Sequence, residues 1–71
     1  MYLIRFDTQM GPLWVTGYLV GHGHGQGWHF DYSSWRLKAM HFLNREVANE
    51  VVVRLMEGKS GPNPYTVEEA S

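Results

Sequence analysis

The residues best suited to chemistry lie in a glycine-rich run, Gly21-His22-Gly23-His24-Gly25-Gln26-Gly27. His22 and His24 are two positions apart, so both side chains can point to one side of an extended segment. Imidazole is the commonest metal ligand in proteins, and His29 and His41 are further candidates from other segments. The run holds no acidic residue and no His-Glu-x-x-His pattern, so its spacing is not typical of a metal site. We predict no bound metal and no cofactor.

Glycine at every second position leaves too few side chains for packing, so the run is predicted to be a loop. Successive backbone N–H groups of such a loop can also capture an anion, although the run lacks the Lys and Ser/Thr of a phosphate-binding loop. We favour a flexible turn with incidental histidines. The alternative function is an oligomeric protein that sequesters a small ligand or nucleotide, with His22, His24 and Arg36 as the binding residues.

Candidates for catalysis are few. The chain has no Cys, which excludes thiol nucleophiles, disulfides and Cys-based zinc sites. Ser33 and Ser34 are typical turn and cap residues. His29 and Asp31 share one face of a predicted strand, but polar pairs are common on a solvated sheet face. No nucleophile with an oriented base can be assembled from these residues, so we predict that the protein is not an enzyme.

Alternating apolar residues predict three strands, at 2–7, 13–20 and 28–32, arranged as an antiparallel meander. Gly17 interrupts the second strand and indicates a bulge or a close backbone approach. Regular alternation along that strand would place Val15 on one face, and Trp14 and Tyr18 together on the other. Residues 34–38 are predicted to form one helical turn. Residues 39–42 fit either a short edge strand or the end of that turn.

Apolar residues at helical spacing predict one helix over 45–57; they are Val47, Ala48, Val51, Val52, Leu55 and Met56. Asn44 is the expected N-cap and Gly58 the expected residue after the C-cap. Glu50 and Arg54 are four residues apart, in the order that favours an ion pair on a helix.

The expected fold is therefore α+β, with a small antiparallel sheet of three to four strands packed against one C-terminal helix. A single domain is expected over 1–58, followed by an irregular C-terminal tail over 59–71, in which 65–67 could add a short strand. Trp28, Phe30 and Phe42 are assigned to the core beneath the helix.

Composition excludes several classes of protein. The 71 residues include 6 Lys+Arg and 7 Asp+Glu, for a net charge of −1. This balance argues against nucleic-acid binding, although aromatic strand residues can stack bases. No apolar run is long enough to span a bilayer. Arg5 and Asp7 interrupt the first apolar stretch, so neither a signal peptide nor membrane association is expected.

The predicted sheet is apolar on both faces, whereas one helix covers only one face. Large exposed apolar patches usually mark interaction surfaces, and a chain this small buries only about 60% of its surface. We therefore expect a protein–protein surface, for a foreign partner or for a second copy in a homo-oligomer. The alternative is that the Trp and Tyr side chains wrap the sheet edges and fill a thin core. Trp14, Tyr18 and Trp35 are the predicted aromatic anchors, since Trp and Tyr are enriched at interface hot spots.

The span from Ser33 to Leu55 resembles a pattern common in small phage-encoded accessory proteins. The pattern is carried by Ser33-Ser34, Lys38-Ala39, Phe42, Glu46-Val47-Ala48 and the following Val/Leu stripe. The resemblance implies a meander followed by a turn and one helix. It also implies a protein of the bacterial cytoplasm that binds and inhibits a host protein or a defence system without catalysis.

Overall fold

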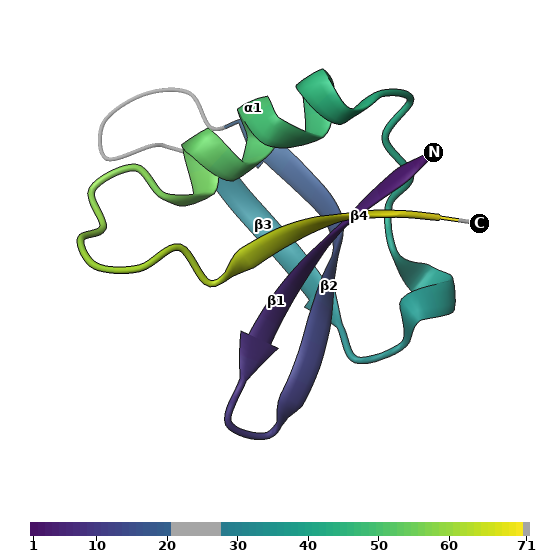
Figure 1. The fold of residues 1–71 in the computed structure, drawn as a ribbon, viewed down its shortest axis with the longest axis horizontal. Coiled ribbons are helices and arrows are strands. Elements are labelled where there is room, and N and C mark those ends of the chain that lie inside the picture. The colour runs from purple at the N-terminus through teal and green to yellow at the C-terminus, as the bar shows by residue number, and fades with distance from the viewer. Residues whose placement is uncertain (21–27, 71) are drawn as a thin grey trace.

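The computed structural model describes residues 1–20 and 28–70, with the backbone alone for Leu19, Val20 and Trp28. The core position predicted for the Trp28 side chain thus lies outside what is described. The elements are β1 (Tyr2–Thr8), β2 (Gly11–Val20), β3 (Trp28–Ser33), the 3₁₀ turn η1 (Arg36–Lys38), α1 (Arg45–Leu55) and β4 (Tyr65–Glu69). The strands form one antiparallel sheet in the order β3-β2-β1-β4 (Figure 1). The predicted α+β fold is confirmed.

The main core lies between α1 and the half of the sheet formed by β1 and β4 (Figure 1). Its buried residues are Ala48, Val51, Val52 and Leu55 from α1, with Ile4, Val15, Phe42 and Tyr65 from the rest of the chain. The helix begins as predicted, because the Asn44 side chain accepts a hydrogen bond of 2.9 Å from the Val47 N–H. Gly58 follows the helix with a φ of 75°, in the left-handed region that favours glycine.

The bulge predicted at Gly17 is present, as a register shift between Val15 and Gly17 in the pairing of β2 with β3. One extra residue in a strand reverses which face the following side chains occupy. Tyr18 therefore lies on the helix side of the sheet, where its ring contacts Phe30 at 6.1 Å between centroids. The expectation that Trp14 and Tyr18 share a face is wrong for this reason.

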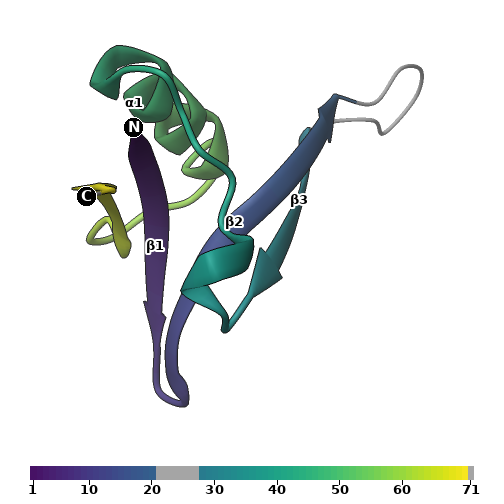
Figure 2. The ribbon, with the colours of Figure 1, turned by 90° about the vertical axis from the view of Figure 1, so that its right-hand side faces the viewer.

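Residues 39–42 form an extended segment that lies between β1 and β2. The two strands pair only as far as Arg5 and Trp14. Beyond that point Tyr2 and Phe42 exchange two backbone hydrogen bonds of 2.8 Å, and the Met40 N–H donates to the Val15 carbonyl at 2.8 Å. Figure 2 shows the consequence: β2 and β3 lean away from β1 and α1.

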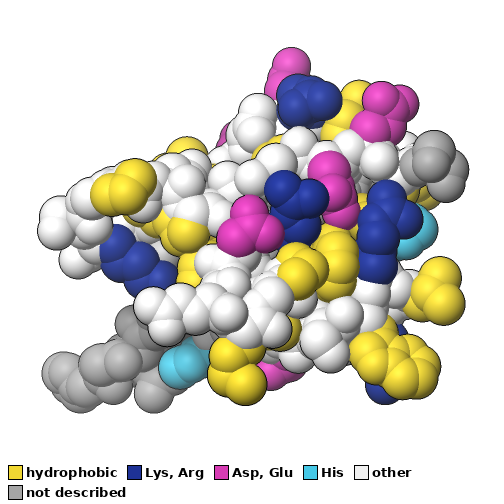
Figure 3. Space-filling view, turned by 60° about the horizontal axis from the view of Figure 1, so that its bottom comes forward, with side chains coloured by type: hydrophobic (Ala, Val, Ile, Leu, Met, Phe, Trp, Pro, Cys, Tyr) yellow, Lys and Arg dark blue, Asp and Glu magenta, His cyan; other side chains and the backbone are white. Residues whose placement is uncertain are grey.

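The face of the sheet opposite α1 is partly closed by the chain around η1. Leu3, Trp14 and Ala39 form a small second core there. The Trp14 indole N–H donates to a Glu68 carboxylate oxygen at 2.7 Å, and Glu68 also pairs with Arg5 at 3.4 Å and Arg36 at 3.3 Å. Acidic and basic side chains alternate on this side of the molecule (Figure 3). The expectation that one sheet face as a whole lacks cover is therefore wrong.

The C-terminal segment belongs to the folded body. Residues 59–71 are predicted as an irregular tail in which 65–67 could add a short strand. That strand is present as β4 and is longer than expected: it pairs with β1 along its whole length, from Tyr2 opposite Glu69 to Phe6 opposite Tyr65. Tyr65 is buried and Val67 packs against the main core, so the alternating side chains of this short strand hold it on the sheet. Within residues 1–20 and 28–70, no helix has the length and apolar character needed to cross a membrane.

Removing the Glu68 carboxylate should test the second core. Glu68→Ala leaves the buried Trp14 N–H without its acceptor, which costs about 1–3 kcal/mol. Glu68→Gln keeps an oxygen acceptor and should lose about 1 kcal/mol or less from the partly exposed ion pairs. Denaturant unfolding measures both, with Glu69→Ala on the same strand as the control. Equal losses for the Ala and Gln variants would contradict the assigned role of the indole hydrogen bond.

Candidate functional site

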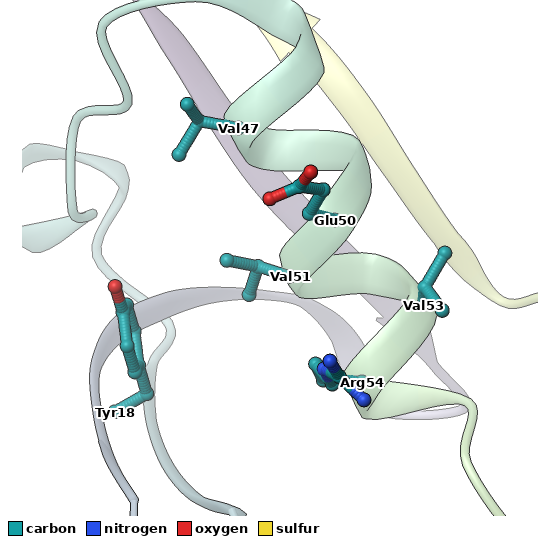
Figure 4. Close-up of a pocket in the computed structure, with 6 residues that line it drawn as sticks. All are labelled: Tyr18, Val47, Glu50, Val51, Val53 and Arg54. Carbon is teal, nitrogen blue, oxygen red and sulfur yellow. The ribbon is translucent and has the colours of Figure 1, made fainter.

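A groove lies beside α1, between the helix and the part of the sheet that the helix does not cover. β2 and β3 lean away from α1 (Figure 2), and the gap between Tyr18 of β2 and the helix forms the groove. Tyr18 lines the sheet side of the groove, and the helix side is lined by Val47, Glu50, Val51, Val53 and Arg54 (Figure 4). Its volume is about 390 Å³, within the range of about 300–1,000 Å³ found for ligand pockets.

The lining of this groove is accessible and combines apolar and polar surface in similar amounts. Tyr18 is 38% exposed, Val47 41% and Val53 62%, whereas Val51 is buried and connects the groove to the main core. Val47 was predicted in the buried stripe, but it lies at the edge of that stripe and faces the gap. Leaving these side chains in water is unfavourable, so the groove is suited to receive an apolar group.

The two charged residues of the groove, Glu50 and Arg54, differ in their ion pairing. The ion pair predicted between Glu50 and Arg54 does not form, because Arg54 pairs with Glu57 at 2.8 Å. Among the residues that the structure describes, no basic group lies within ion-pair distance of Glu50. The groove therefore combines apolar side chains with the Glu50 carboxylate, which forms no ion pair among the described residues, and with the Arg54 guanidinium, which is paired with Glu57. An apolar group with a positive charge placed next to Glu50 suits this arrangement.

An aromatic cluster holds the strands that flank the groove in place. The Phe6 ring stacks on Tyr65 at 5.0 Å and contacts Tyr32 at 6.1 Å, and the two tyrosine hydroxyls lie 3.3 Å apart. Burial raises the pKa of Tyr32 above its usual range, and its contact with Tyr65 adds to this effect. The cluster ties β3 to β1 and β4 across the sheet.

The three predicted aromatic anchors lie in different surroundings. Tyr18 lines the groove, whereas Trp14 is buried in the second core and engaged by Glu68. Trp35 is 66% exposed, and its neighbour Lys38 lies with Nζ 5.6 Å from the indole centroid. The fold thus separates Tyr18 from Trp35, because Trp35 precedes η1 on the side of the sheet opposite α1.

The residues of the alternative ligand site are not brought together in the part of the chain that is described. His22 and His24 lie outside the described residues, and Arg36 is held by Glu68 at 3.3 Å. His29 and His41 are both exposed. No group of three or more His, Cys, Asp or Glu residues suited to a metal occurs within residues 1–20 and 28–70.

Sequence reasoning did not find the helix side of the groove. The available signal was Val53, an apolar residue outside the buried stripe, together with the possibility that a bulge at Gly17 redirects Tyr18. Comparison of the chain with protein-family models, curated proteins and solved structures found no match. The groove and the exposed Trp35 are therefore interpreted from their own geometry.

The raised pKa of Tyr32 predicts a loss of stability in alkaline solution. In the unfolded chain tyrosine ionises near pH 10, whereas folded Tyr32 stays neutral at that pH. The folded state then holds more protons, so the contribution of Tyr32 to the free energy of unfolding should be constant below about pH 10 and fall above it. Denaturant unfolding at several pH values, from about two pH units below the unfolded tyrosine pKa to about one unit above it, measures this contribution. Above that pKa the free energy of unfolding should fall less steeply for Tyr32→Phe than for the wild type. Superimposable pH profiles for the two proteins would contradict this assignment.

Proposed function

We propose that this chain is a non-enzymatic binding protein that occludes a surface of a partner protein, and that the groove beside Tyr18 is its contact site. The supporting observation is the groove itself. It exposes Tyr18 and Val47 at the edge of the core and sets Glu50 beside them without a basic partner among the described residues.

The chemistry of the groove defines the segment that it would receive. A large apolar or aromatic side chain would fill the space between Tyr18 and Val51, and burying such a side chain contributes about 1.5–3 kcal/mol. A Lys or Arg next to it would meet Glu50. The partner segment is therefore an exposed apolar side chain adjacent to a cation, and Tyr18 is the anchor on this chain.

The cellular setting belongs to the same proposal. The resemblance of Ser33–Leu55 to small phage-encoded accessory proteins supports a role in the bacterial cytoplasm, where binding would inhibit a host factor or a defence system. Surface occlusion suits a protein of this size, because blocking a partner's contact surface requires affinity and shape but no reacting groups.

Replacing Tyr18 should remove partner binding. The partner is first captured from a bacterial lysate with the wild-type protein, identified and purified, and its affinity is then measured by calorimetry. Tyr18→Ala should weaken binding by about 30-fold or more, because a hot-spot side chain contributes about 2 kcal/mol or more.

Met10→Ala is the matched control, since Met10 is 99% exposed at the β1–β2 turn, away from the groove. It should bind as the wild type does, and circular dichroism should show both variants folded. A partner that binds the Tyr18 variant with unchanged affinity would refute the groove as the contact site.

A further inference from the structure

We propose that copies of this chain associate head to tail, with Trp35 and Lys38 of one copy occupying the groove of the next. This inference rests on the groove of the proposed function and names a second copy of the chain as an occupant. The groove needs an apolar side chain next to a cation, and the chain displays this combination on its own surface.

Trp35 and Lys38 match the groove in chemistry. The indole of Trp35 is 66% exposed, and Lys38 places its ammonium 5.6 Å from the ring centroid. Within the described residues Lys38 forms no ion pair, so its charge is available to Glu50 of another copy. The neighbouring Arg36 cannot take this part without leaving Glu68. In the complex the indole would lie between Tyr18 and Val51, with the ammonium turned towards Glu50.

The position of the two surfaces excludes contact within one molecule. The groove lies on the helix side of the sheet, and η1 lies on the other side, beside Trp14 and Ala39. Figure 1 shows α1 and the turn that follows β3 at opposite parts of the molecule. Each contact between copies therefore leaves one groove and one Trp35 unused at the two ends. Such a heterologous contact extends into an oligomer unless the rotation closes a ring.

The contact is expected to be weak, since one inserted side chain buries much less than the area of about 1,200–2,000 Å² of a stable interface. A foreign partner with a similar segment would compete for the same groove. Self-association would then cover grooves that hold no partner, and the partner would reverse it by competition. The fraction of grooves free to bind the partner would therefore depend on the concentration of this chain.

Complementary variants test this arrangement. Trp35→Ala keeps the groove but loses the inserting side chain, whereas Tyr18→Ala keeps the inserting side chain but alters the groove. Sedimentation velocity from about 10 µM to about 1 mM, which spans weak affinities, should show concentration-dependent association of the wild type. Each variant alone should remain monomeric, and their equimolar mixture should form a 1:1 dimer and nothing larger.

A charge exchange provides the second test. Lys38→Glu and Glu50→Lys should each weaken self-association by about tenfold, and mixing these two variants should restore a contact between the altered charges. Met10→Ala should associate as the wild type does. Wild-type protein that stays monomeric at about 1 mM, or Trp35→Ala protein that associates like the wild type, would overturn the head-to-tail contact.

The two proposals fail separately. If the wild type is monomeric but Tyr18→Ala still abolishes partner binding, the head-to-tail contact is wrong and the proposed function stands. If self-association behaves as expected but the partner binds Tyr18→Ala unchanged, the proposed function is wrong and the self-contact stands.

Discussion

The insertion of residues 39–42 between β1 and β2 is the constraint on which the rest of this structure depends. Backbone groups of Tyr2 and Val15 that would otherwise pair across these strands bond instead to Met40 and Phe42. Buried backbone groups without partners are costly, so the strands can separate only because this segment satisfies them. The side chain of Phe42 is carried into the main core by the same insertion.

The separation divides the sheet into two halves with different environments. β1 and β4 lie under α1, whereas β2 and β3 lean away from the helix (Figure 2). The groove lies between Tyr18 of β2 and the helix. The segment that leads into the insertion covers the opposite face and buries Trp14 there. Among the described residues, exposed apolar side chains line the groove and also include Trp35 and its neighbour Leu37, which is 93% exposed.

The parts of the fold that side-chain periodicity encodes were predictable. The helix, its Asn44 cap and the first three strands follow from spacing, because their buried residues repeat at the period of the element. The sheet face of Tyr18 was not predictable, since a glycine indicates a bulge without fixing the pairing register. The insertion of residues 39–42 was not predictable either, because it is held by backbone hydrogen bonds, which leave no pattern of side chains in the sequence. The groove depends on both the new face of Tyr18 and the insertion. Of its lining residues, the sequence therefore identified only Tyr18 as a binding residue.

Amide hydrogen exchange at Tyr2, Met40 and Phe42 tests the central claim most directly. These three N–H groups are the donors of the inserted segment's hydrogen bonds, and bonded core amides open only with a large part of the fold. We predict protection comparable to that of the buried α1 residues Val51 and Val52. Exchange at the rate of an unstructured chain, while α1 remains protected, would show that β1 and β2 are not held apart in this way.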